Sequence, residues 1–95
     1  MNAAMDLDQT NFFEYPKLTR RLRLQYEPAQ ESWVLLYPEG MVQLNASAAE
    51  ILRRCDGGHT VSSIVQELEK LFNIQGIAAQ VQALIDEGTH RGWIE

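Results

Sequence analysis

The sequence predicts an α+β fold in which a three-stranded antiparallel sheet is followed by three helices. In residues 21–26, apolar side chains alternate with polar ones, which is the period of a strand with one buried face, and two short apolar segments follow within residues 33–44. From residue 48 onward apolar side chains recur at every third or fourth position, as in an amphipathic helix. Three strands and three helices in 95 residues indicate one winged-helix-like domain in which the strands come first.

Three segments have the pattern of strands. Residues 21–26 alternate basic or polar with apolar side chains, which predicts a half-buried strand. Residues 33–37 are apolar throughout, as expected of a central strand that is buried on both faces. Residues 41–44 form a third, short strand. Turns with proline in the second position, at residues 27–30 and 37–40, join the three segments.

The third strand is the candidate binding element. In a simple meander the second strand is central, so the first and third are edges with unpaired backbone groups. The third strand, Met41, Val42, Gln43 and Leu44, is therefore expected to accept an additional strand from a partner. Proline at Val42 would remove a backbone donor, so Val42→Pro is expected to abolish the binding of such a partner.

Each of the three helices has start or stop signals. The first begins at Asn45 or Ser47, both candidate N-caps, and ends before Gly57. The second is capped by Thr60 and ends in a break at residues 73–76, after which the third helix begins. The expected buried stripes are Ala48, Ile51, Leu52 and Cys55 in the first helix, Val61, Ile64, Val65, Leu68, Leu71 and Phe72 in the second, and Ile77, Val81, Leu84, Ile85 and Gly88 in the third.

Composition limits the domain number, the compartment and the partners. Residues 1–15 have no sustained periodicity and are predicted to form a mobile tail, which leaves residues 16–95 as the domain. The net charge of −5 argues against a protein that binds a phosphate backbone. No apolar run approaches the length of about 20 residues that a membrane span needs. The single cysteine, Cys55, is typical of the reducing cytoplasm.

Side chains that catalyse reactions or bind metals are scattered along the chain. Cys55 is expected to be buried, His59 to lie in a solvated turn, and His90 to close the third helix. This pattern offers neither a metal site nor a nucleophile with an adjacent base. Gly57-Gly58 lacks the Lys-Ser/Thr pair of a phosphate-binding loop. No metal, cofactor or catalytic residue is therefore expected, and the chain is predicted not to be an enzyme.

Basic residues cluster near the first strand and at the end of the first helix. Arg20, Arg21 and Arg23 either form a solvated face that protects an edge from aggregation, or contact an acidic peptide or a partner protein. Arg53 and Arg54 are further candidates for such a contact. A winged-helix-like domain can also bind DNA, but the third helix of this one carries acidic residues and glutamines with a single arginine at its end.

The chain resembles the coenzyme PQQ synthesis protein D (PqqD) family over residues 16–95. The most specific matching segments are Leu35–Asn45 and Glu50–Gly57, which occur together. The shorter matches are Pro16 with Leu18, Arg23-Leu24-Gln25, Thr60-Val61 with Ile64-Val65, and Gly92-Trp93-Ile94.

The resemblance implies a non-catalytic peptide chaperone of pyrroloquinoline quinone biosynthesis, of the type called a RiPP recognition element. Such a protein binds the ribosomally made precursor peptide PqqA and presents it to the radical SAM enzyme PqqE, which cross-links a glutamate and a tyrosine of the peptide. The peptide is added to the third strand, where Val81, Leu84 and Ile85 of the third helix are either the wall of a groove or ordinary core. A DNA-binding regulator and a carrier of the quinone are the alternatives. The open edge allows a monomer or a dimer.

Overall fold

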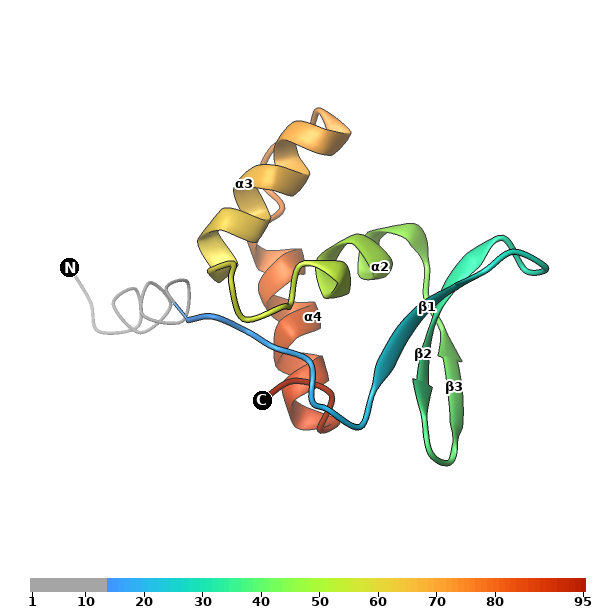
Figure 1. Ribbon diagram of the computed structural model, residues 1–95. Coiled ribbons are helices and arrows are strands. Elements are labelled where there is room, and N and C mark those ends of the chain that lie inside the picture. Colours follow the sequence, from blue (N-terminus) through green and yellow to red (C-terminus); the bar gives the residue numbers. More distant parts are fainter. Residues whose placement is uncertain (1–13) are drawn as a thin grey trace.

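The structure is a computed structural model that describes residues 14–95 (Figure 1). The strands are β1 (Arg23–Glu27), β2 (Ser32–Tyr37) and β3 (Gly40–Gln43), and the helices are α2 (Ala46–Arg53), α3 (Val61–Phe72) and α4 (Ala78–His90). The predicted α+β order, strands first, is confirmed. All but two residues of the predicted tail, 1–15, lie outside the described part of the chain, so the tail stays a prediction.

The sheet is an antiparallel meander in the order β1-β2-β3. Leu24 lies opposite Leu35, and Leu35 lies opposite Val42. These three side chains belong to or pack against the hydrophobic core, so they share the face that is turned toward the helices. Val34 points the other way and is still fully buried, between Gln25 and Gln43 on the flanking strands. The central strand is thus buried on both faces, as predicted.

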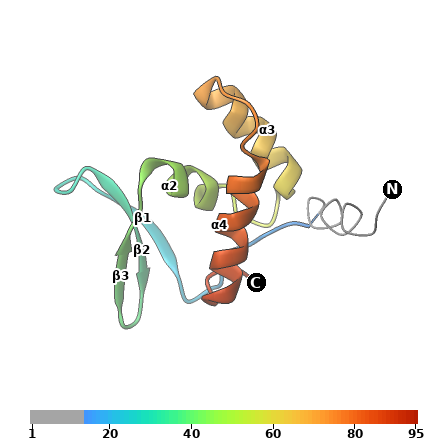
Figure 2. The same cartoon turned by 180° about the vertical axis from the view of Figure 1, so that it is seen from behind.

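Helix α2 joins the sheet to the other two helices (Figures 1 and 2). It begins at Asn45, whose side-chain oxygen accepts a hydrogen bond of 2.8 Å from the backbone N–H of Ala48. Of the two candidate N-caps, Ser47 is therefore wrong, because it already lies inside the first helical turn. The predicted cap of α3 is confirmed, since Thr60 accepts a hydrogen bond of 3.0 Å from the N–H of Ser63.

One apolar core lies between the sheet and the three helices. Its largest fully buried side chains include Leu35 of β2, Leu52 of α2, Ile64 and Leu68 of α3, and Val81 of α4. Each predicted helical stripe contributes to this core. Burial of these apolar surfaces is the main stabilisation of a fold of this size.

The predicted stripe of α3 is wrong at its C-terminal end. Leu71 is 54% exposed and Phe72 is 40% exposed. Both lie in the last turn of α3, which projects beyond α2 and α4 in Figures 1 and 2. Helical spacing predicts the face on which an apolar residue lies, but that face is buried only where a neighbouring element covers it.

Segments from both ends of the domain lie side by side and join the last helix to the sheet. Leu18 donates a backbone hydrogen bond of 3.0 Å to Cys55, and Thr19 donates one of 2.9 Å to Trp93. Leu18 also forms an isolated antiparallel bridge with Ile94. The residues that follow α4 are therefore held beside those that precede β1, and this arrangement builds one wall of the site.

Candidate functional site

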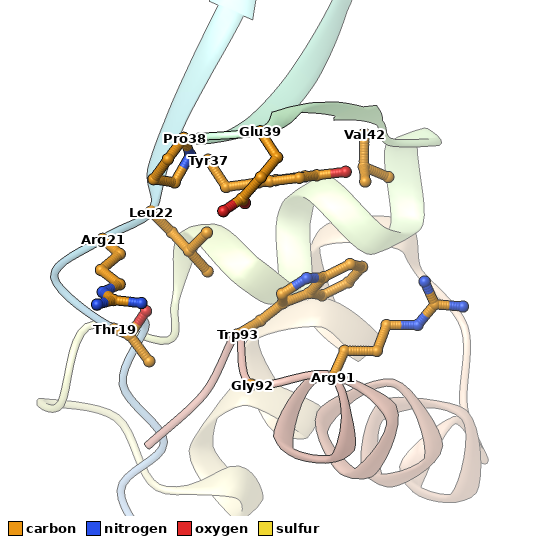
Figure 3. Close-up of a pocket in the computed structure, with 10 residues that line it drawn as sticks. All are labelled: Thr19, Arg21, Leu22, Tyr37, Pro38, Glu39, Val42, Arg91, Gly92 and Trp93. Atoms are coloured by element: carbon orange, nitrogen blue, oxygen red, sulfur yellow. The ribbon is translucent and has the colours of Figure 1, made fainter.

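A groove of about 450 Å³ lies between the β2–β3 hairpin and the chain that follows α4 (Figure 3). The hairpin side supplies Tyr37, Pro38, Glu39 and Val42. The opposite side is formed by Arg91, Gly92 and Trp93, and the segment before β1 adds Thr19, Arg21 and Leu22. Apolar and aromatic side chains share its lining with charged ones, as in many binding grooves.

A tight turn at the end of α4 brings Trp93 into this groove. Gly92 has a φ of +81°, a left-handed conformation that glycine adopts without steric cost. The N–H of Trp93 then donates a 2.7 Å hydrogen bond to the carbonyl of Gly88. A Cβ at Gly88 would lie only 2.8 Å from the Cδ1 atom of Ile94, so a larger residue there would require this buried side chain to move. The two glycines thus turn the chain back and aim the indole at the sheet.

The hydrogen bonding between β2 and β3 determines which backbone groups of β3 face the open edge. Leu44 donates to the carbonyl of Trp33 over 2.9 Å, so these two form a hydrogen-bonded pair. Such pairs alternate along an antiparallel ladder, so Val42 and Leu35 form the next one. The N–H and C=O groups of the intervening residues, Met41 and Gln43, consequently point away from β2.

The same alternation changes the meaning of the proline substitution expected from the sequence. The N–H of Val42 points toward β2, so Val42→Pro would disrupt the β2–β3 pairing and not the open edge alone. Met41 is the better position for a proline that blocks only the open edge of β3. Its N–H faces outward, and its side chain is 48% exposed on the face of the sheet that is turned away from the helices.

The predicted site residues of α4 do not lie in the groove with Val42. Val81 and Ile85 are only 1% and 5% exposed and belong to the core, and Leu84 is partly buried against it. None of the three lines the groove beside Val42. Leu44 of the predicted strand lies just after β3 and is also buried in the core. Their contact with a peptide stays a prediction.

Sequence reasoning missed the residues that form the opposite wall. The sequence predicts Trp93 only as part of an apolar match near the end of the chain, and it does not identify Arg91 or Tyr37 as site residues. The available signal was the Gly92-Trp93 pair directly after a helix, since a glycine that ends a helix often redirects a following apolar residue onto the fold.

Arg91 is held at the margin of the groove by two neighbours. Its Nε donates to the carboxylate of Glu87, one helical turn earlier. Its guanidinium carbon lies 5.3 Å from the centre of the Trp93 ring, within the range of a cation–π contact. The hydrogen bond from Arg91 lowers the pKa of Glu87, so this carboxylate stays ionised and keeps its partner in place.

The arginines that the sequence predicts as partner contacts do not all lie around the groove. Arg21 lines it, whereas Arg20 and Arg23 are exposed nearby without lining it. Arg54 joins α2 to α3 through Glu50 and Glu67, at 2.8 Å and 2.9 Å.

Arg53 has a similar structural contact, because its guanidinium lies 4.8 Å from the ring of Trp33. It also pairs with Glu50 at 3.2 Å. A role for any of these arginines in contacting a partner stays a prediction.

The cysteine and the histidines do not form a reactive group. Burial and the nearby Asp56 raise the pKa of the Cys55 thiol to about 12, so it stays protonated and poorly nucleophilic. His59 lies in the turn before α3, as predicted, but it is only 28% exposed there and lies 3.0 Å from Asp56 and 3.1 Å from Glu67. Within residues 14–95, no three acidic, histidine or cysteine side chains gather into a possible metal site. In the same part of the chain, no helix has the length and apolar character to cross a membrane.

Comparisons with known proteins agree with this fold. The family model of coenzyme PQQ synthesis protein D (PqqD) matches residues 32–94. A protein of Methylococcus capsulatus named PqqA binding protein is 45% identical over 78 residues, which cover 82% of this chain and 84% of that protein. The protein of the same name from Azotobacter vinelandii is 43% identical over 90 residues, or 94% of this chain and 98% of that one.

A solved structure resembles nearly the whole chain. It is the solution NMR structure of the PqqD part of Methylobacterium extorquens PqqCD, described as a functional and stand-alone RiPP recognition element. The two share 28% identity with a TM-score of 0.67, and the match covers 92% of this chain and 98% of that one. The family model, the curated relatives and this structure together show that the chain belongs to the PqqD family.

Proposed function

We propose that this protein binds the precursor peptide PqqA in pyrroloquinoline quinone biosynthesis and presents it, without catalysis of its own, to the radical SAM enzyme PqqE. Membership of the PqqD family and the name of its relatives, PqqA binding protein, support the first part. The Cys55 thiol, which burial keeps protonated, favours a binding role over a nucleophilic one.

The observation that carries the proposal is an open strand edge directly beside a groove. The peptide would lie along β3 as a fourth strand and pair with the outward N–H and C=O groups of Met41 and Gln43. These backbone bonds supply affinity for any extended chain and demand little of its sequence.

Side chains in the groove would supply the specificity. Alternate residues of an added strand point to the same face of the sheet. The peptide residue opposite Val42, and those two positions away from it, would therefore enter the groove between the hairpin and Trp93. Leu84, which is partly buried, is the one predicted α4 wall residue with surface left for a longer peptide, since Val81 and Ile85 are core.

Calorimetric titration with full-length PqqA at moderate salt tests the proposal. Saturable binding with one peptide per protein is expected, and addition of PqqE should give a ternary complex in size-exclusion chromatography. A titration with duplex DNA at low salt serves as the control for the regulator alternative, and no heat is expected from it. If PqqA fails to bind both in the absence and in the presence of PqqE, the proposal is wrong.

A further inference from the structure

Arg91 has hydrogen-bond donors that remain available at the position an added strand would occupy. It caps the C-terminal end of α4, and its side chain is 55% exposed. Only its Nε has a partner among residues 14–95, the carboxylate of Glu87. The two terminal nitrogens therefore remain as a fork of donors, a geometry that suits a carboxylate.

The position of this fork is largely fixed before any ligand arrives. The Glu87 ion pair and the Trp93 ring hold the guanidinium from two sides. A long side chain that is already ordered loses less conformational entropy when it binds. Figure 3 shows Arg91 and Trp93 together on one side of the groove, facing Val42 and Tyr37 on the other.

The charges around α4 distinguish two grooves. The groove beside β3 is lined by two arginines and one glutamate, Arg21, Arg91 and Glu39. A second groove, on another face of α4, is lined by three acidic residues, Glu14, Asp86 and Glu95, and by no basic residue. Even when Glu87, the ion-pair partner of Arg91, is counted, the arginines of the first groove balance its carboxylates, so this groove lacks the acidic excess of the second and can accept an acidic ligand.

We propose that the groove selects a peptide strand with a carboxylate and an apolar side chain two residues apart. The terminal nitrogens of Arg91 bind the carboxylate, and Val42 and the Trp93 ring receive the apolar side chain. The spacing of two follows from the strand period, because only alternate residues face the groove. Glu39, on the hairpin, repels the carboxylate from that end and so orients the peptide. This inference rests on the proposed addition of PqqA to β3.

A double-mutant cycle with PqqA as the probe tests the inference. Each Asp or Glu of the peptide is replaced singly by Asn or Gln, and each peptide is titrated into the wild-type protein and into Arg91→Gln. One peptide acid should couple to Arg91: either change alone weakens binding about five- to tenfold, and the two together weaken it little further. Arg91→Lys should retain part of the affinity, because it keeps the charge and loses the fork.

Controls separate this inference from loss of the fold and from loss of the proposed function. Lys70→Gln removes an exposed basic residue near the far end of α3 and should couple to no peptide acid. Arg91→Glu should be rescued by Lys at the coupled peptide position, which a merely misfolded variant would not allow. If the wild-type protein binds PqqA, but the loss of affinity from each peptide substitution simply adds to the loss from Arg91→Gln, this inference alone is wrong. Absence of wild-type binding overturns the proposed function itself.

Discussion

The two edge strands of the sheet expose similar backbone groups in different surroundings. By the alternation of the ladder, Leu24 and Tyr26 of β1 face outward, as Met41 and Gln43 of β3 do. Val42 of β3 lines the groove against Trp93, whereas no residue of β1 lines it. An open edge therefore does not by itself define a binding site. A site also requires a groove that receives the side chains of the added strand.

The largest effect is expected when one edge is blocked and the other serves as its control. Met41→Pro removes an outward N–H of β3 and should weaken PqqA binding at least about thirtyfold, the equivalent of about 2 kcal/mol for a lost donor and a displaced strand. Tyr26→Pro removes an outward N–H of β1 and should leave affinity unchanged. Calorimetry measures both, and Met41→Ala corrects for the lost side chain.

Thermal unfolding must show that both proline variants are folded. Equal affinities of folded Met41→Pro and Tyr26→Pro would mean that the β3 edge is not the site.

A smaller effect should distinguish the two tryptophans. Both are partly buried, but Trp93 lines the groove and Trp33 packs in the sheet against Tyr26. Trp93→Leu should weaken PqqA binding about tenfold, because aromatic side chains in a groove contribute disproportionately to affinity. Trp33→Leu should lower the unfolding temperature and leave affinity nearly unchanged. The reverse order of the two affinities would locate the peptide elsewhere.

The sequence predicted the strands, the meander and the Thr60 cap because these follow from local periods and capping preferences. The predicted buried stripe of α3 extends too far, to Leu71 and Phe72. Periodicity does not show that no neighbouring element covers this end of the helix. It also did not tell which β3 residues face the edge. That depends on the alternation of hydrogen-bonded pairs with β2, which leaves no mark on side-chain polarity.

The wall formed by Arg91 and Trp93 was beyond sequence reasoning for another reason. It depends on the turn at Gly92 and on the pairing of residues 17–19 with residues 93–95, a contact between distant parts of the chain. Val81 and Ile85, which the resemblance suggested as a groove wall or as ordinary core, are core residues, and helical spacing could not separate these two alternatives.

The stability of the fold should depend modestly on pH through a group that lies outside the groove. The hydrogen bond to Asp56 raises the pKa of His59, with a further contribution from Glu67. Its stabilisation is therefore complete below the unfolded pKa of about 6.5 and is lost as the pH rises through the folded value. Because the site is partly solvated, less than about 1 kcal/mol is expected. The lowered pKa of Asp56 acts in the opposite sense, and its contribution is lost only in acid.

Urea unfolding at pH 6 and pH 8.5 measures this contribution. The wild-type protein should be slightly less stable at the higher pH, and His59→Gln should reduce the difference while PqqA affinity at pH 8.5 stays unchanged. A pH difference that persists in His59→Gln would assign it to another group.

The smallest effect is expected at the exposed end of α3. Leu71→Gln and Phe72→Gln should change the free energy of unfolding by no more than about 0.5 kcal/mol, because both residues are already exposed at the end of α3 and lie outside the core. Neither should alter PqqA affinity, since neither lines the groove. Urea unfolding and calorimetry check this, and a large loss of affinity would place peptide contacts on α3.

Amide hydrogen exchange, resolved by residue and measured with and without PqqA, tests the central claim most directly. In the free protein the amides of Met41 and Gln43 should exchange quickly, whereas that of Val42 is already protected by β2. Saturation with PqqA should protect Met41 and Gln43 and leave Leu24 and Tyr26 of β1 unchanged. Protection of the β1 amides, or saturated binding with no protection at Met41 and Gln43, would contradict the addition of the peptide to β3.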